Sequence, residues 1–171
     1  MLAALPYADL AGSRDPLDLL ASTPEEIAHL VRNWEPGRWV GTYARGKWSA
    51  AQLILHLAQD EIGWSNRIRL ALTTDNYVVQ TYDAGEWVVR EAPTEHETAL
   101  SAFLALRKLN LILYRRMPEG ARARRFSHGE FGEISIDWIL KTLAGHDLHH
   151  LRQLQVIADT ENQGIPRAKE S

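Results

Sequence analysis

The sequence predicts an all-α fold, a four-helix bundle with a long crossover between the second and third helices. Four long stretches repeat apolar residues with a helical period, and most begin at a capping residue. Residues 119–134, by contrast, are rich in glycine and suggest a loop or a short hairpin before the fourth helix. We therefore expect a single domain over residues 1–171, with a core at about 15–160 and a C-terminal tail at 161–171.

The first helix has two competing start signals. Asp15 and Thr23 each offer a capping side chain directly before a proline, which is favoured at the first helical position. We expect the helix either to restart or to kink at the second signal. Apolar residues continue on one face from Ile27, and Pro36 with the glycine after it is expected to end the segment.

The second helix is predicted to begin at Ser49 and to reach about Leu72. Ser49 followed by Gln52 is a capping-box pattern. One stripe along this stretch carries Leu53, Leu57, Trp64, Ile68 and Ala71. Residues 73–93 then mix polar, aromatic and turn-forming types without a sustained period, which predicts a crossover packed over the bundle.

The last two helices are predicted to begin near Thr94 and Ser135. The third has Pro118 as its stop, and its expected inward residues are Ala99, Phe103, Leu106, Leu113 and Met117. The fourth reaches about Thr160, and its inward stripe reads Ile139, Leu143, His146, His150, Leu154 and Ile157. Two histidines thus occupy positions where a buried stripe usually carries Leu or Ile.

The two stripe histidines suggest a metal site. His146 and His150 lie one helical turn apart, so their imidazoles can point at one ion. His149 falls on the flank and is assigned to solvent, a neighbour or the outer shell. His56 borders the inward stripe of the second helix and is the best candidate for a third ligand. Asp60, one turn later, is placed either to orient a ligating histidine or to ligate.

The histidines also allow two other interpretations. A histidine on an apolar face is often a hydrogen-bonded core residue, and this alternative stays open on spacing alone. His29, His96 and His128 have no comparable partner, so ordinary surface or structural roles are expected, although His128 is close enough to reach the site mouth. The segment from His146 also resembles the metalloprotease H-E-x-x-H helix, but Asp147 is one methylene too short for the base.

Composition limits the chemistry and the partners. The chain has no cysteine, so a metal must be held by histidine or carboxylate and any thiol must come from outside. The net charge is −3 and the basic residues are scattered apart from a short run at 122–125, so no nucleic-acid partner is expected. No stretch approaches the roughly 20 apolar residues of a membrane span, and the N-terminus lacks a basic leader. We expect a cytoplasmic protein.

Three separated motifs resemble the DinB/YfiT-like superfamily of four-helix metalloproteins. GKWSAAQLILHLAQDE resembles the family's helix start leading to a ligand histidine, which falls on His56. LAGHDLHHLRQLQ resembles its closing H-x-x-x-H helix, with ligands at His146 and His150, and IRLALTTDNYVVQTYDAGEW resembles the crossover of the YfiT branch. The resemblance covers about residues 20–160. It departs at His128, which lacks a following proline, and at Asp147.

The resemblance implies an up-down-down-up bundle, a homodimer, and a nickel or zinc ion with positions left to water. It also implies activity on a small-molecule substrate. We favour a thiol-dependent S-transferase acting on small electrophiles with a low-molecular-weight thiol, because no evident general base accompanies the histidines. A metal-dependent hydrolase and a non-catalytic stress-related metal-binding module are the alternatives. Trp64, Tyr82 and Trp87 would favour catalysis as pocket walls, but we expect ordinary core aromatics.

Overall fold

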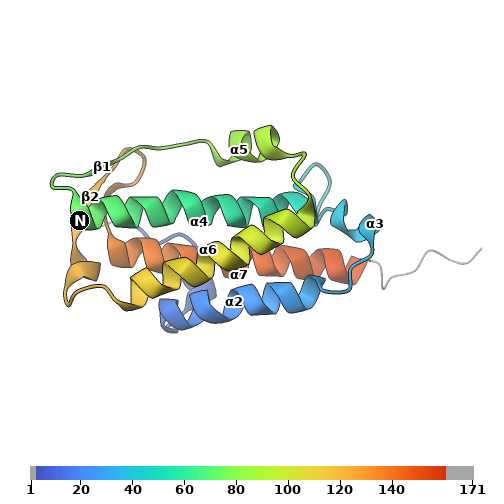
Figure 1. Ribbon diagram of the computed structural model, residues 1–171, viewed down its shortest axis with the longest axis horizontal. Coiled ribbons are helices and arrows are strands. Elements are labelled where there is room, and N and C mark those ends of the chain that lie inside the picture. Colours follow the sequence, from blue (N-terminus) through green and yellow to red (C-terminus); the bar gives the residue numbers. More distant parts are fainter. Residues whose placement is uncertain (1–2, 161–171) are drawn as a thin grey trace, which may run out of the picture.

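Four long helices form an elongated bundle in the computed structural model, which describes residues 3–160 (Figure 1). The helices are α2 (Pro16–Val31), α4 (Ala50–Thr73), α6 (His96–Arg115) and α7 (Ile136–Thr160). The colours of Figure 1 show that α2 and α7 run in one direction and α4 and α6 in the other. Both α2 and α4 pack on α6 and on α7. The predicted four-helix bundle is confirmed, while the predicted tail at 161–171 lies outside the described residues.

Short elements connect and cover the long helices. They are α1 (Ala8–Ala11), α3 (Pro36–Trp39), β1 (Val78–Val79), α5 (Ala84–Glu91), η1 (Ala121–Ala123), β2 (Arg125–His128) and β3 (Gly132–Ser135). β2 pairs antiparallel with β3, which confirms the hairpin suggested for 119–134, and β1 pairs parallel with β2, with Val79 opposite His128. The crossover therefore contains a strand and a helix that were not predicted, because both are too short to show a period. No helix of the described part is long and apolar enough to cross a membrane.

The first long helix does not restart at its second signal. The Asp15 carboxylate accepts two backbone N–H groups of the first turn, at 2.7 and 3.4 Å, and so caps α2. The helix then continues through Pro24 and ends at Val31. Pro36, expected to end the helix, instead opens the short α3.

One buried guanidinium links all four long helices. Arg107 of α6, 2% exposed, contacts Glu61 of α4 and Asp147 of α7, both at 2.6 Å. It also donates to the carbonyl oxygen of Leu20 in α2 at 3.0 Å. That carbonyl lacks its usual helical partner, because Pro24, four residues later, has no N–H.

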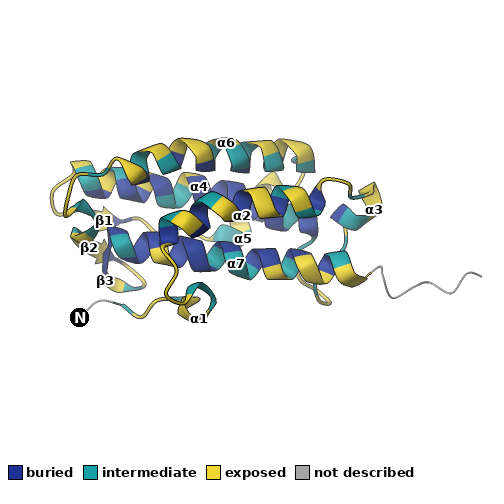
Figure 2. Ribbon diagram, turned by 90° about the horizontal axis from the view of Figure 1, so that it is seen from below, coloured by how far each residue is buried: buried dark blue, intermediate teal, exposed yellow. Residues whose placement is uncertain are grey.

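The buried face of α6 is more polar than its pattern predicts. Three expected inward residues, Leu106, Leu113 and Met117, are only half-buried. Fully buried positions belong instead to Arg107 and Asn110, whose amide donates to the Glu61 carboxylate at 2.9 Å. The buried positions line the inner faces of the long helices (Figure 2).

A polar layer divides the core of the bundle. One apolar cluster includes Leu20, Ile68 and Ile139, and the other includes Leu53 and Leu154. Between them, buried polar side chains follow one another along α4 and α7: His56, Gln59, Asp60, Glu61, Ser65, Arg67, Asp147 and His150. Because unpaired polar groups are costly to bury, this layer is where the fold most needs partners or a ligand.

Candidate metal centre

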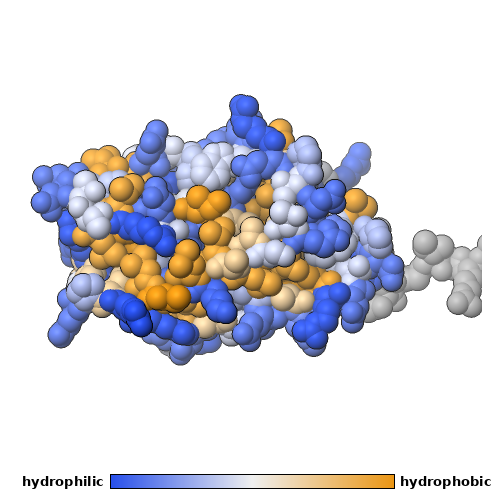
Figure 3. All heavy atoms as spheres, in the orientation of Figure 1, coloured by the Kyte–Doolittle hydropathy of each residue, from blue (hydrophilic) through white to orange (hydrophobic). Residues whose placement is uncertain are grey.

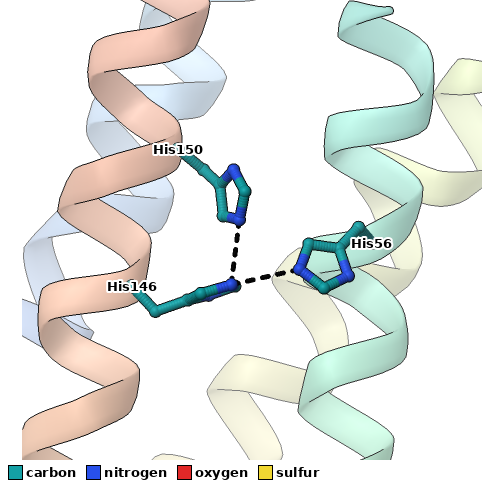
Figure 4. A group of neighbouring side chains, drawn as sticks. All are labelled: His56, His146 and His150. Atoms are coloured by element: carbon teal, nitrogen blue, oxygen red, sulfur yellow. Dashed lines mark hydrogen bonds between the residues drawn. The ribbon is translucent and has the colours of Figure 1, made fainter. Parts of the chain in front are cut away.

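Three histidines from two helices meet in the polar layer. His56 projects from α4, and His146 and His150 project from successive turns of α7 (Figure 4). The Nε2 atom of His146 lies 3.1 Å from Nε2 of His56 and 2.9 Å from Nε2 of His150. His56 and His150 are buried and His146 is half-buried. The structure thus brings together all three candidate ligands.

These nitrogens fit a shared metal ion better than they fit one another. A neutral ring nitrogen carries either one hydrogen or one lone pair, so Nε2 of His146 cannot make two good hydrogen bonds with its two neighbours. A metal–nitrogen bond of about 2.05 Å would place ligand nitrogens about 2.9 Å apart in an octahedron and about 3.3 Å apart in a tetrahedron. The observed 2.9 and 3.1 Å agree with these values.

Burial keeps the cluster in the form that binds metals. The pKa values of His146 and His150 lie well below the ordinary histidine value because burial disfavours the imidazolium, and the neighbouring imidazoles act in the same direction. Burial also lowers the pKa of His56, against the opposing charge of Asp60. At neutral pH the rings are therefore uncharged, with lone pairs available.

Gln153 fixes the tautomer of one candidate ligand. Its Oε1 lies 2.7 Å from Nδ1 of His150, so that nitrogen carries the hydrogen and Nε2 keeps its lone pair for a metal. The amide nitrogen of Gln153 lies 2.9 Å from Nε2 of His149, which places His149 outside the three-histidine cluster. Sequence reasoning missed Gln153, although its position three residues after His150 puts both on one helical face.

Asp60 lies beside the cluster. Its Oδ1 accepts a hydrogen bond from the Tyr82 hydroxyl at 3.1 Å. Its Oδ2 lies 3.5 Å from Nδ1 of His146 and 3.7 Å from Nε2 of His56. Burial raises the pKa of Asp60, and the charge of His56, when protonated, opposes that rise. The carboxylate therefore lies closest to the outward-facing nitrogen of His146, which has no hydrogen-bond partner.

A cavity of about 220 Å³ opens beside the histidines. Trp64 and Tyr82 line it, so their assignment as ordinary core aromatics is wrong. Trp64 lies two turns after His56 on the same helical face, and the crossover carries Tyr82 across that face. Trp87 stacks on Tyr82 with ring centroids 4.1 Å apart. Further lining residues include Pro6, Tyr7, Asp60, Arg67, His128, Glu130, Phe131, Leu143 and His146.

The segment before α2 covers part of the site. The Tyr7 ring lies 5.7 Å from the His146 ring and 5.0 Å from the His149 ring, between centroids. Tyr7 packs so closely on α7 that a Cβ atom at Gly145 would lie 2.8 Å from both its Cβ and its carbonyl oxygen. No signal in the sequence pairs this segment with α7, and sequence reasoning missed it.

The remaining histidines and Asp147 take other roles. His128 is buried in the hairpin, where its Nδ1 accepts the backbone N–H groups of the next turn at 3.1 and 3.3 Å, and it lines the cavity. His96 stacks on Trp39 at 4.1 Å, and His29 is exposed. The Asp147 carboxylate is bound by the guanidinium of Arg107 inside the bundle, so it does not lie where the general base of a metalloprotease would have to lie.

The fold and the three converging histidines define a four-helix-bundle protein of a metal-binding class. The chain belongs to the DinB superfamily, whose family profile matches residues 19–154. The family named on the sequence motifs is thereby confirmed.

Curated relatives agree with this family, and solved structures share the fold. Two proteins of Oceanobacillus iheyensis, each named "Putative metal-dependent hydrolase", are 30% identical over 72% of this chain and 71% of the relative, and 34% identical over 66% of each. YfiT from Bacillus subtilis, called "a probable metal-dependent hydrolase with an unusual four-helix bundle topology", shares the fold with a TM-score of 0.80 and 20% identity over 86% of both chains. A mycothiol-dependent maleylpyruvate isomerase shares the fold with a TM-score of 0.66 and 15% identity, over 88% of this chain and 61% of that one.

Proposed function

We propose that the protein binds one divalent metal ion, nickel or zinc, through Nε2 of His56, His146 and His150 and transfers a small thiol to a small electrophile. The convergence of three imidazole nitrogens at the wall of a cavity carries this proposal. Three protein ligands leave coordination positions open, as in catalytic rather than structural metal sites. Nitrogen ligands suit both metals, with nickel favoured by affinity.

When bound, the ion would lower the pKa of a thiol or a water in its free position. With a chlorinated electrophile, the thiol sulfur forms a carbon–sulfur bond while the carbon–chlorine bond breaks. Chloride leaves, and the thiol proton passes to solvent. The chain binds and orients the reactants: Gln153 holds the His150 ring, and the aromatic walls of Trp64 and Phe131 exclude water from the reacting atoms.

The surroundings of Asp60 favour thiol transfer over hydrolysis. Tyr82 donates to one of its oxygens, and the other faces Nδ1 of His146. With one oxygen held by Tyr82, this carboxylate is better suited to orienting a ligand histidine, as second-shell partners of metal-bound histidines do, than to acting as a general base. The shared fold of a mycothiol-dependent isomerase also supports the use of a thiol.

A metal-dependent hydrolase is the second candidate. Oδ2 of Asp60 lies 3.7 Å from Nε2 of His56 and so remains near the ligand nitrogens, where it could accept a proton from water. The names of the relatives point the same way. A non-catalytic stress-related metal-binding module would leave the cavity without a role.

The test is conjugate formation by protein loaded with nickel or zinc. Cysteine or glutathione is mixed with monochlorobimane, a chlorinated acceptor, and the fluorescent conjugate is measured against a no-enzyme reaction and the His150→Ala variant. We expect a rate above both. Hydrolysis of p-nitrophenyl phosphate or a p-nitroanilide without any conjugate would instead establish the hydrolase, and inactivity in both assays would favour the binding module.

We further propose that the protein acts as a homodimer in the cytoplasm, where low-molecular-weight thiols are kept reduced. Apolar side chains gather where α4 and α6 face outward (Figure 3), and Ile62, Leu109 and Ile112 are more than half exposed there. Such a patch on a protein surface is typical of a contact with another chain. Light scattering of the Ile112→Glu variant, with the unmodified chain beside it, tests this point.

A further inference from the structure

Arg67 of α4 is a buried cation on the wall of the cavity. It is 6% exposed and lines the same cavity as His56 and His146. Its guanidinium carbon lies 4.3 Å from the centroid of the Trp64 ring and 4.7 Å from that of the Tyr82 ring. The two aromatic rings hold the guanidinium in place, but they do not accept hydrogen bonds from the N–H donors, which lie in the guanidinium plane.

The charge of Arg67 has no partner of opposite sign in contact. Burial lowers the pKa of Arg67 and the charges of Asp60 and Glu130 oppose this through space, but among residues 3–160 no carboxylate oxygen forms an ion pair with its guanidinium within 4.0 Å. Its one hydrogen bond runs from Nη2 to the carbonyl oxygen of Gln80 at 3.3 Å. Arg107, by contrast, is buried against two carboxylates. A guanidinium has five N–H donors and is costly to bury unpaired, so Arg67 is suited to receive an anion from the cavity.

His128 adds a second unsatisfied donor to the same wall. Its Nδ1 accepts two backbone N–H groups, so the ring hydrogen is on Nε2. That Nε2 is buried and has no hydrogen-bond partner among the described residues. His128 and Arg67 both lie against Trp64, with the His128 ring 6.3 Å from the Trp64 ring. Two donors without acceptors in one place indicate that an acceptor is missing there.

We propose that this cavity selects a carboxylate-bearing substrate, whose carboxylate is bound by the guanidinium of Arg67 with help from Nε2–H of His128, while its reacting end lies at the three histidines. This inference rests on the proposed function and names the substrate class. A planar guanidinium pairs with a planar carboxylate through two parallel hydrogen bonds, which makes a carboxylate its best-matched anion.

The fold also limits the length of the substrate. His56 and Arg67 are eleven residues apart on α4, about 16 Å along the helix axis. Both side chains lean back toward the N-terminal end of the helix, and because arginine is the longer of the two, the span between their polar groups is shorter than this. A substrate whose carboxylate lies one or two carbons from the reacting atom would be too short to reach from the histidines to Arg67. A chain of about six carbons would cover more of that distance.

The first experiment needs no metal. The metal-free protein is titrated with hexanoate and with hexanamide, which has the same shape without the charge, and heat and Trp fluorescence are recorded. We expect hexanoate to bind at least about ten-fold more tightly, the effect of a charge-assisted hydrogen bond. Arg67→Met should remove this preference and Arg67→Lys should retain part of it, while Arg90→Met, which removes a charge from the exposed α5, should leave it unchanged.

The second experiment places a thiol on the metal. Cobalt-loaded protein is titrated with 6-mercaptohexanoate, 6-mercaptohexanol, mercaptoacetate and 2-mercaptoethanol, and thiolate-to-cobalt absorption is measured. We expect 6-mercaptohexanoate to bind about ten-fold more tightly than 6-mercaptohexanol, and no such difference between mercaptoacetate and 2-mercaptoethanol. Arg67→Met should lose the preference for the long acid. Equal binding of acid and alcohol, together with equal binding of hexanoate and hexanamide, would overturn the inference. Absence of the absorption band with every thiol would count against the proposed function, leaving the first experiment to decide on Arg67.

Unfolding of Arg67→Met does not weaken these tests. Methionine is apolar and fills much of the space between the two rings, and the melting curve of each variant is recorded first. If Arg67→Met does not fold, the comparison of acid and amide on the unmodified chain and on Arg67→Lys still gives the answer, because a carboxylate preference must be present in the first and reduced in the second.

Discussion

The guanidinium of Arg107 donates to the carbonyl oxygen of Leu20, 3.0 Å away, and so replaces the backbone hydrogen bond that Pro24 cannot make. The same guanidinium binds Glu61 and Asp147, each of which is the direct neighbour of a residue of the site, Asp60 or His146. Since these contacts tie α4 and α7 to one point of α6, they fix the relative height of the two helices that carry the histidines.

Replacing Arg107 with methionine is therefore expected to cost about 3–5 kcal/mol in the free energy of unfolding, because Glu61 and Asp147 would stay buried without their cation. Urea denaturation measures this loss, and Arg90→Met, on the exposed face of α5, is the control. Further replacement of both carboxylates by glutamine and asparagine should recover part of the loss. A loss below about 1 kcal/mol would show that the polar layer does not depend on this cation.

The neutral histidine cluster predicts a pH dependence of the metal-free protein. The unfolded chain protonates His56, His146 and His150 below about pH 6.5, whereas burial lowers their pKa values in the folded chain. The unfolded state then binds more protons, so this contribution falls as pH drops through about 6.5. Burial raises the pKa of Asp60 and brings that of Asp147 to about 6, which acts in the opposite sense.

The difference between two chains isolates the histidine contribution to that dependence. His150→Leu removes one titrating ring and keeps the apolar stripe, so its urea midpoint should fall less between about pH 7 and pH 5 than that of the unmodified chain. Both chains are measured metal-free, in the presence of a chelator. Parallel curves would show that His150 titrates alike in the folded and unfolded states.

Gln153 predicts a loss of metal affinity without a loss of fold. Gln153→Ala removes the acceptor at Nδ1 of His150, and changes of this kind weaken metal binding by about 10–100-fold. Gln155→Ala, on the exposed side of α7, should bind as the unmodified chain does. His150→Ala should lose the ion and still fold. Competition with a chelating dye measures affinity, and an unchanged affinity in Gln153→Ala would separate His150 from the proposed ligand set.

Much of this fold is readable from the sequence because its long helices repeat apolar residues over many turns. His146 and His150 stand out because they interrupt such a repeat. Arg107 does not stand out, since a charged residue is normally assigned to solvent. Its burial depends on partners from three other helices, and no local pattern brings the Leu20 carbonyl, left free by Pro24, next to α6. The strand and the helix of the crossover were not predicted for a different reason: both are too short to show a repeat of apolar residues.

Gly145 predicts how the segment before α2 is held on the site. Alanine there would favour the helix by about 1 kcal/mol, yet its Cβ would lie 2.8 Å from the Cβ and carbonyl oxygen of Tyr7. Since backbone is part of the clash, the segment must move away from α7 and uncover His146. We expect faster amide hydrogen exchange at residues 3–11, with α7 still protected. Gly37→Ala, whose Cβ would meet no atom within 4 Å, is the control. Unchanged exchange at residues 3–11 in Gly145→Ala would show that the helix yields instead of the segment.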